Sequence, residues 1–271
     1  MRDVARLWHG EGGEIGLVPT MGALHAGHMS LIERARAENS RVVASIFVNP
    51  LQFGPSEDFE RYPRQPELDL EMLRAAGVDA AYVPVVGDMY PPGMTTRVVV
   101  HGVAESLEGK ERPGHFEGVA TAVAKLFWAC RADRAYFGQK DAQQVAVVRR
   151  VAADLDSGVE IRVCPTIREP DGLAISSRNA GLDLEGRRAA PALSRALRSA
   201  AGAYKAGERE PSRLQRVMLD VLGQEPLAEV GYAELVDPVT FEPPGTLAVL
   251  AVRIGKTRLI DNHDLAESLP G

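Results

Sequence analysis

The chain has 271 residues, of which 45% are hydrophobic and 25% are charged, and its formal net charge is −6. This length can bury one or two cores, and the weakly acidic balance argues against a nucleic-acid binder that relies on a broad basic field. The longest apolar run is far too short to span a bilayer, and the first residues lack the apolar core of a signal peptide. Two cysteines without a CxxC spacing predict buried free thiols. We therefore expect a cytoplasmic protein that binds neither a membrane nor a nucleic acid.

The first two thirds of the chain alternate short apolar runs with stretches of helical spacing. Strands are predicted at 16–20, 41–48, 78–84, 134–138 and 159–166, and helices at 28–39, 66–77, 118–131 and 141–155. This alternation predicts a parallel sheet with crossover helices. Ligands of such sheets bind at the carboxyl ends of the strands, and the unusual polar clusters of this chain all follow predicted strands.

The character of the chain changes after Thr166. A polar, glycine-rich connection leads to helices predicted at 186–207 and 211–223. Two late strands are predicted at 228–238 and 247–261, separated by the turn signal FEPPGT. These features predict a domain boundary near residue 167 and a smaller second domain.

The first polar cluster, PTMGALHAGHMSL, follows the first strand and opens a helix. His25 and His28 are three residues apart, so an early helix start places both imidazoles on one side. Helix N-termini attract phosphate, and Gly22 and Gly27 let the backbone approach a nucleotide closely. A capped turn with two surface histidines is an equally open alternative, whereas a metal site lacks a third ligand at a recognisable spacing.

The second and third clusters carry neutral amides and a basic loop. Asn49 and Gln52, in FVNPLQFG, suit a polar substrate with hydroxyls or a carboxylate, although ordinary Asn-Pro turn chemistry also explains them. Asp69, on the next predicted helix, is a candidate ligand of Mg²⁺, and a solvated helix face is the simpler interpretation of a single acid. Arg112 and His115 precede an apolar helix, where capping is the alternative.

Two further clusters offer partners for phosphate. In FGQKDAQQ, Lys140 can reach a polyphosphate as a point charge, while Asp141 also fits as a helix cap, and Gln144 shares its helix face. In DGLAISSRN, two serine hydroxyls and Arg178 together suit phosphate oxygens, and the nearby glycine allows loop closure. An N-cap serine beside a surface arginine is the alternative.

Five sequence blocks, taken together and in this order, resemble the pantothenate synthetase family of the HIGH-motif nucleotidyltransferases. The blocks are PTMGALHAGH, FVNPLQFG, RPGHFEGV, FGQKDAQQ and DGLAISSRN. They span residues 19–179 with spacing like that of the family, whereas HAGH alone indicates only the superfamily. The C-terminal third matches in general character. The resemblance implies an α/β fold with a Rossmann-like, parallel-sheet domain over residues 1–166. A smaller α+β domain over residues 167–271 is expected to close over the active site.

The resemblance implies roles for single positions. His25, His28 and Lys140 are expected to be catalytic, and His28 occupies the position usually called the proton donor. Contacts with ATP are implied for a larger set of residues: Met21, Gly22, Ala23, Leu24, His25, Ala26, Gly27, His28, Gly138, Gln139, Lys140, Asp141, Ile167, Ile175, Ser176, Ser177 and Arg178.

The resemblance also implies a substrate site, with Gln52 and Gln144 holding pantoate and Gln52 also near β-alanine. The remaining candidates for this site are Asn49, Arg112 and His115. Ile175 stands where the family often has methionine, a departure that leaves the polar contacts intact. Leu68 replaces one member of an acidic pair sometimes assigned to Mg²⁺, so only Asp69 remains, and water and phosphate oxygens could complete the coordination.

The implied reaction joins (R)-pantoate to β-alanine with ATP and Mg²⁺, and it yields pantothenate, AMP and pyrophosphate through a pantoyl-adenylate. A homodimer is the usual form of the family. A cytidylyltransferase-like enzyme on the same fold is one alternative, and it would not need the two glutamines. A non-catalytic nucleotide-binding regulator is another. A dehydrogenase is disfavoured because no GxGxxG follows the first strand.

Overall fold

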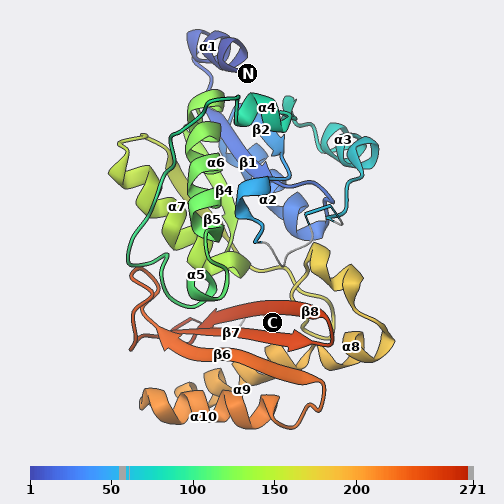
Figure 1. Cartoon of the computed structure of the whole chain (residues 1–271), viewed down its shortest axis with the longest axis vertical. Helices are drawn as coiled ribbons and strands as arrows, with labels where there is room; N and C mark the ends of the chain where they lie inside the picture. The colour runs from blue at the N-terminus through green and yellow to red at the C-terminus, as the bar shows by residue number, and fades with distance from the viewer. Residues whose placement is uncertain (55–58, 61, 268–271) are drawn as a thin grey trace. The chain divides into compact units, whose positions relative to one another are not determined.

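The computed structural model describes residues 1–54, 59–60 and 62–267 (Figure 1). It divides into two compact units, one of residues 1–138 and 143–165, the other of residues 139–142 and 166–271. The boundary placed at 166/167 from the sequence lies one residue from this division. The sequence did not indicate that the short segment 139–142 groups with the second unit.

The first unit is built on five parallel strands in the order β3-β2-β1-β4-β5. The strands are β1 (Ile15–Thr20), β2 (Arg41–Ile46), β3 (Ala80–Tyr82), β4 (Arg134–Gly138) and β5 (Glu160–Cys164). β1 pairs with β2 on one side and with β4 on the other, so the winding of the sheet reverses between β1 and β4. Ligands of such sheets bind beyond the carboxyl ends of the strands at this reversal. The predicted α/β fold class is confirmed.

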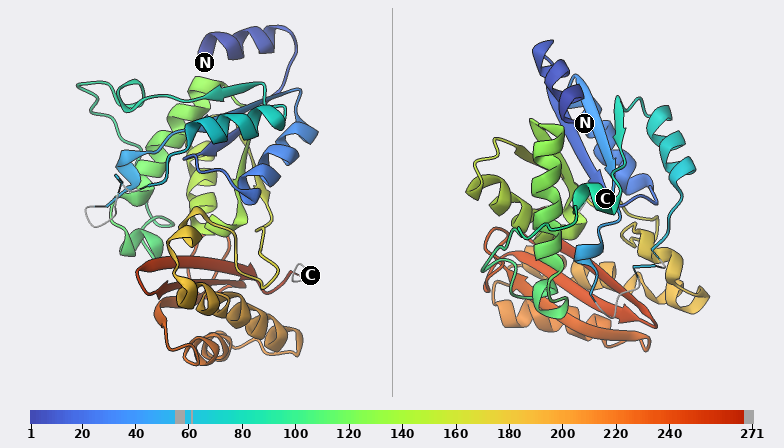
Figure 2. Two further views of the ribbon diagram at one scale, coloured as in Figure 1. Left: turned by 90° about the vertical axis from the view of Figure 1, so that its right-hand side faces the viewer. Right: turned by 45° about the horizontal axis from the view of Figure 1, so that its top comes forward.

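Helices cover both faces of this sheet (Figures 1 and 2). The apolar helix α6 (His115–Cys130) and α7 (Ala142–Asp154) pack with Leu17, Val43 and Phe137 on one face. α2 (Ala26–Glu38) and α3 (Pro66–Ala75) pack with Val18 and Ala44 on the other. Because adjacent residues of each strand face opposite layers, both layers need apolar side chains, which explains the uninterrupted apolar strand sequences.

Short elements that the sequence pattern does not predict complete the first unit. They are α1 (Arg2–Gly10), α4 (Val86–Met89), α5 (Glu108–Glu111) and the 3-10 turn η1 (Pro50–Gln52). Apart from α1, each spans four residues or fewer, so hydrophobic periodicity has too few turns to reveal it. Within the described part of the chain, no helix combines the length and apolar character needed to cross a membrane.

The second unit carries an antiparallel sheet, β6 (Ala228–Val236), β7 (Leu247–Ile254) and β8 (Thr257–Asp264), paired in that order. α9 (Ala192–Lys205) and α10 (Pro211–Leu222) cover one face of it (Figure 2). The predicted single strand at 247–261 is wrong, because Gly255, at φ +58°, turns the chain into a hairpin. The predicted helix at 186–207 is two helices, α8 (Leu184–Ala189) and α9, with Pro191 as the N-cap of α9.

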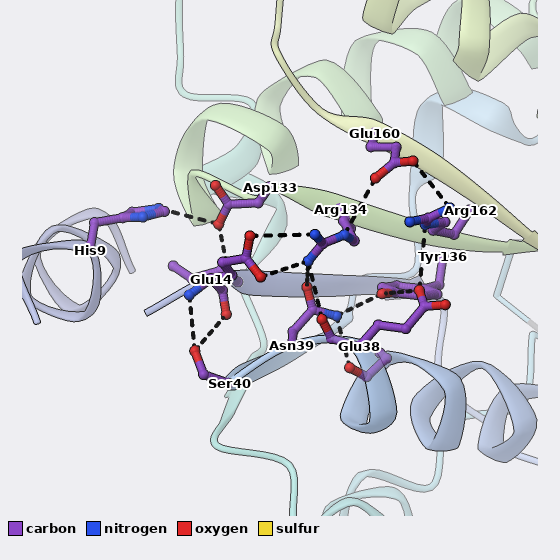
Figure 3. A network of polar contacts seen from close by, with 12 residues as sticks. His9, Glu14, Glu38, Asn39, Ser40, Asp133, Arg134, Tyr136, Glu160 and Arg162 are labelled. Carbon is purple, nitrogen blue, oxygen red and sulfur yellow. Dashed lines mark hydrogen bonds and ion pairs between the residues drawn. The ribbon is translucent and has the colours of Figure 1, made fainter. Parts of the chain in front are cut away.

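A closed polar network joins the amino ends of β1 and β4 (Figure 3). Arg134 donates to the carboxylate of Glu14 at 3.0 Å and to the side-chain oxygen of Asn39 at 3.0 Å. The amide of Asn39 donates to the hydroxyl of Tyr136 at 2.6 Å, and that hydroxyl donates to Glu38 at 2.8 Å. Burial raises the pKa of Tyr136 to about 12. These bonds link the first residue of β4 to the residues before β1 and after α2, so the network stabilises the end of the sheet that lies away from the predicted ligand site.

Both cysteines are buried free thiols, as the sequence predicts. Burial raises the pKa of Cys130 to about 12 and also raises the pKa of Cys164. Both thiols therefore stay protonated near neutral pH and behave as small apolar side chains.

We expect Tyr136→Phe to lower the free energy of unfolding by about 1–3 kcal/mol, because the substitution leaves Glu38 and Asn39 without the hydroxyl between them. Urea denaturation followed by circular dichroism measures this change. Ligand binding beyond the carboxyl ends of the strands should stay as in the wild type, since the network lies at their amino ends. Tyr204→Phe keeps the ring that stacks on Arg209 and is the matched control. An equal loss in both variants would contradict a special role of the network.

Candidate active site

The turn that follows β1 is tied together from inside the unit. The hydroxyl of Thr20 donates to the carbonyl of Ser45 at 2.7 Å and accepts the amide of Gly22 at 3.2 Å. Gly22 has a φ of +81° and Ala23 a φ of +51°, so two consecutive residues are left-handed. For the alanine this conformation costs about 1–2 kcal/mol, and neighbouring contacts must offset it.

The offsetting contact comes from Asp69 on α3. One carboxylate oxygen accepts the amide of Ala23 at 2.9 Å, and the other accepts the amide of Leu24 at 2.8 Å. Only 1% of Asp69 is exposed to solvent. A Cβ at Gly22 would stand 2.8 Å from the nearer oxygen, so a side chain there would clash with the carboxylate. The candidate metal ligand thus has both oxygens occupied by the turn.

The two histidines of the turn lie at the start of α2. The Nδ1 atom of His25 accepts the amide of Gly27 at 3.1 Å, and His25 is thereby the N-cap of the helix. In the neutral ring the proton is then on Nε2, which becomes a donor. The rings of His25 and His28 stack with their centroids 4.0 Å apart. A Cβ at Gly27 would lie 3.0 Å from the His25 ring, so glycine allows this cap to form.

The turn η1 follows β2 and presents Gln52. Asn49, of which 2% is exposed, accepts the amide of Leu51 at 3.1 Å and the hydroxyl of Tyr90 at 2.7 Å. Its own amide donates to the carbonyl of Gly118 at 3.0 Å and to the side-chain oxygen of Gln52 at 3.1 Å. Asn49 therefore shapes the turn, as the turn-chemistry alternative expected.

Gln52 is further held by the basic loop before α6. The Nε2 atom of His115 takes a hydrogen bond from Arg112 at 2.9 Å, and its Nδ1 atom lies 2.9 Å from the backbone carbonyl of Gln52. These partners require the tautomer with the proton on Nδ1. The side-chain amide of Gln52 donates to the sulfur of Met21 at 3.1 Å, so the turns after β1 and β2 meet at this glutamine.

Two residues that the sequence analysis did not single out hold this region in place. A Cβ at Gly118 would stand 2.4 Å from the backbone of Leu51, so only glycine lets α6 approach η1 this closely. Gln143 is buried, accepts the amide of Glu108 at 3.1 Å and donates to the carbonyls of Val103 and Ser106 at 2.9 Å. Its neighbour Gln144 is half-buried. A glycine and a glutamine identify such packing only when the tertiary neighbours are known.

The remaining candidates after Gly138, where β4 ends, lie in the second unit. The 3-10 turn η2 (Gln139–Asp141) carries Lys140, whose ammonium lies 3.8 Å from the carboxylate of Asp141. Asn262 of β8 donates to the carbonyls of Gln139 and Lys140 at 2.9 Å each. The side chain of Lys140 is 16% exposed.

A small hairpin presents the last group of candidates. Arg168 bridges Ala174, and the amide of Ile175 donates to the carbonyl of Ile167 at 2.9 Å. The hydroxyl of Ser176 accepts the amide of Arg178 and is the N-cap of the 3-10 turn η3 (Ser177–Gly181). The capping alternative for this serine is therefore present in the structure, and the Arg178 side chain is exposed.

The candidates thus form two groups, each described within its own unit. The first unit gathers the set Met21, Gly22, Ala23, Leu24, His25, Ala26, Gly27, His28, Asn49, Gln52, Asp69, Arg112 and His115 around the turns after β1 and β2, while Gln144 lies on α7. The second unit carries 139–141 on η2 together with Ile167 and 175–178. Among the residues that the structure describes, no group of three histidine, cysteine or acidic side chains could hold a metal ion.

The model of the pantoate-beta-alanine ligase family matches residues 1–264. Two curated relatives named pantothenate synthetase, from Herpetosiphon aurantiacus and Rubrobacter xylanophilus, are each 53% identical and cover 97% and 98% of this chain, at 96% of their own length. The solved pantothenate synthetase of Thermus thermophilus has a TM-score of 0.91 at 48% identity over 93% of both chains. A ligase from Francisella tularensis, solved with β-γ ATP and β-alanine, has a TM-score of 0.79 at 35% identity over 97% of both chains.

We expect Asp69→Asn to lower the free energy of unfolding by about 1–3 kcal/mol and to weaken ATP binding, because the new NH₂ group faces a backbone N–H. Chemical denaturation and calorimetric titration with ATP measure the two effects. Glu71→Gln changes an exposed acid of the same helix and is the control. Unchanged affinity and stability would show that the carboxylate does not hold the turn.

We expect Gly118→Ala to reduce kcat/KM for pantoate by at least about tenfold, because the added methyl group displaces η1 and with it Gln52. Steady-state kinetics with pantoate as the varied substrate measures the effect. Gly202→Ala adds the same methyl group to α9, where nothing lies within 4 Å, and should leave the kinetics unaltered. Normal pantoate kinetics in Gly118→Ala would separate this close contact from the substrate site.

Proposed function

The chain belongs to the pantoate–β-alanine ligase family, and we propose that it joins pantoate to β-alanine with ATP, forming pantothenate, AMP and pyrophosphate through a pantoyl-adenylate. It is an AMP-forming carbon–nitrogen ligase of the pantothenate synthetase type. The observation that carries this conclusion is similarity over nearly the whole chain to enzymes of this name, one of them solved with β-γ ATP and β-alanine. The paired histidines at the carboxyl end of β1 are the local feature that fits a nucleotide.

The first step needs positioning more than it needs a base. The pantoate carboxylate is already ionised near neutral pH, so it can attack the α-phosphorus of ATP without losing a proton. The new bond joins a carboxylate oxygen to that phosphorus, and the bond to pyrophosphate breaks. Alignment of the two reactants and neutralisation of the phosphate charge supply most of the rate enhancement in such a step.

Donors at both groups of residues fit that task. The Nε2–H of His25 and the ring of His28 lie at the N-terminus of α2, where the helix dipole also favours an anion. In the second unit, Lys140, Arg178 and the hydroxyl of Ser177 offer charge and hydrogen bonds for phosphate oxygens. We assign Met21–His28, Gly138–Asp141, Ile167 and Ile175–Arg178 to the nucleotide.

Pantoate and β-alanine are assigned to the glutamines. Gln52 lies where two turns meet, and its hydrogen bonds place a polar amide beside the β1 turn. Gln144 stands at the family's second glutamine position and is proposed to contact pantoate as well. Its neighbour Gln143 does not share this role, because its side chain is bonded to the loop before α5. The proposed substrate site also includes Asn49, Arg112 and His115, whose main role is to hold Gln52. Asn49 and His115 are hydrogen-bonded to Gln52, and Arg112 is hydrogen-bonded to His115.

Mg²⁺ is proposed to enter with ATP. The described residues offer no cluster of three protein ligands, and Asp69 uses both oxygens on the turn. A small hard cation keeps several waters and binds phosphate oxygens readily, so it can lower the phosphate charge without a protein cage. We therefore propose that Asp69 supports the turn and that the metal is held by nucleotide and water.

The second step joins β-alanine to the acyl group and releases AMP. The amine must lose a proton before it attacks the carbonyl carbon, and the acyl adenylate must be kept from water until then. We propose that the segment 171–179 excludes water, since it carries Ser176, Ser177 and Arg178 beside the hairpin at 167–175. Closure of the C-terminal domain over the active site stays a prediction.

We also propose a homodimer in the cytoplasm. The first unit exposes several large apolar side chains, among them Val85 at 65%, Val99 at 55% and Trp128 at 48%. Contiguous apolar surface is typical of interfaces between proteins, and a second copy of the chain is the partner that the family suggests.

We expect His28→Ala and Lys140→Ala to fold normally and to lose pantoate-dependent exchange of labelled pyrophosphate into ATP by at least about hundredfold. The reason is that each substitution removes a group assigned to the phosphates. Exchange is measured without β-alanine.

Product analysis of the wild-type protein with β-alanine should show AMP and an amide. A dinucleotide-like product would favour a nucleotide transferase, and ATP binding without exchange would favour a regulator. Normal exchange in both variants would remove these residues from the chemistry.

A further inference from the structure

The side chain of Asn262, on β8, holds the short turn η2 that carries Lys140. The amide nitrogen of Asn262 donates to the carbonyl of Gln139 at 2.9 Å and to the carbonyl of Lys140 at 2.9 Å. The side-chain oxygen of Asn262 accepts from the side chain of Gln139 at 3.2 Å. Every hydrogen-bonding group of this amide is therefore used on η2, and only 5% of the residue is exposed.

Asn262 lies on the face of the sheet that α9 and α10 do not cover. Its register partner on β7 is Val249, whereas the neighbouring partners, Ala248 and Leu250, belong to the core packed against the helices. A buried asparagine on this face is not needed for the core of the second unit. The bonds of its side chain go to η2, which contributes two backbone carbonyls and the Gln139 side chain.

The backbone beside Asn262 is itself rigidly held. Asp261 is 3% exposed and forms a two-pronged ion pair with Arg168, with nitrogen–oxygen distances of 2.6 and 2.9 Å. A carboxylate oxygen of Asp261 also accepts the amide of Asn262 at 2.8 Å. Arg168 adds a bond to the carbonyl of Gly172, so β8 is fixed to the hairpin at 167–175 before Asn262 reaches η2.

We propose that Asn262 is a positioning residue that sets the place of the Lys140 ammonium by holding the backbone of η2. The proposal rests on the role proposed above for Lys140 at the phosphates. A 3-10 turn of three residues has few bonds of its own, and two external donors on adjacent carbonyls fix its orientation. The Lys140 side chain is mostly covered and its ammonium lies 3.8 Å from the Asp141 carboxylate of the same turn, so a shift of the η2 backbone moves the ammonium.

The chemistry of the site selects asparagine over its nearest substitutes. Aspartate has the same shape but would set a negatively charged oxygen against two carbonyl oxygens. Alanine removes all three bonds and leaves two half-buried carbonyls without these donors. Serine provides at most one donor and is too short to reach both carbonyls.

The decisive experiment is a double-mutant cycle between Asn262→Ala and Lys140→Ala, read as the KM for ATP and for pantoate. Asn262→Ala alone should raise the KM for ATP by about tenfold and change the KM for pantoate less than about twofold. In the Lys140→Ala background, Asn262→Ala should add less than about twofold, because the group through which it acts is gone. Asn262→Asp should resemble Asn262→Ala, and it takes its place in the cycle if the alanine variant does not fold.

Gln215→Ala is the matched control, since Gln215 of α10 also donates a side-chain amide to a strand carbonyl of this unit, that of Ala233 at 2.8 Å. It should leave both Michaelis constants unaltered. Additive effects in the cycle, equal changes for ATP and pantoate, or an unchanged KM for ATP in Asn262→Ala would each overturn the proposal. If Lys140→Ala itself leaves ATP binding and exchange intact, the proposed role of Lys140 fails, whereas a defective Lys140→Ala beside a normal Asn262→Ala refutes only the role of Asn262.

Discussion

A carboxylate buried beneath the turn from β1 to α2 is the constraint on which the proposed nucleotide site of the first unit depends. Two consecutive left-handed residues end the strand, and their conformation is unfavourable unless the backbone amides that they turn inward find acceptors. Asp69 supplies an acceptor for each of two neighbouring amides. The position of the imidazoles of His25 and His28 follows from that turn, because it determines where the helix begins.

This arrangement changes how the turn is expected to meet a phosphate. A glycine-rich turn suggests backbone amides that point at the anion, yet the amides of Gly22, Ala23 and Leu24 are directed into the protein. The amide of Gly27 is likewise taken by His25. The amides of the turn are therefore used within the protein, and the rings of His25 and His28 and the dipole of α2 lie at the helix start. The glycines therefore serve close packing against a carboxylate and an imidazole more than close approach of a ligand.

The sequence predicts most helices and strands of this protein well, but it does not predict the side-chain contacts that hold the turns between them. The strand at 134–138 matches β4, and the helix at 211–223 is one residue longer than α10, because local periodicity and proline and glycine signals define both. The prediction of one strand over 247–261 runs through Gly255 and Lys256, the two residues that connect β7 and β8 in the hairpin. For Asp69 the sequence offers a metal ligand or a solvated helix face, and the bonds of its carboxylate to amides 45 and 46 residues away leave no local pattern. The roles of Gly118 and Asn262 cannot be predicted from the sequence either, because their contacts are also with residues far away along the chain.

The two ends of the parallel sheet use polar groups in opposite ways. At the amino ends, arginines and acids form ion pairs with one another, as Arg134 does with Glu14 and Arg162 with Glu160. Their charges are therefore balanced within the protein. At the carboxyl end of β1, a buried acid and a capping imidazole satisfy backbone groups instead. A ligase that must gather a polyanion benefits from this division, because the ion pairs that anchor the strands lie at the end of the sheet away from the proposed nucleotide site.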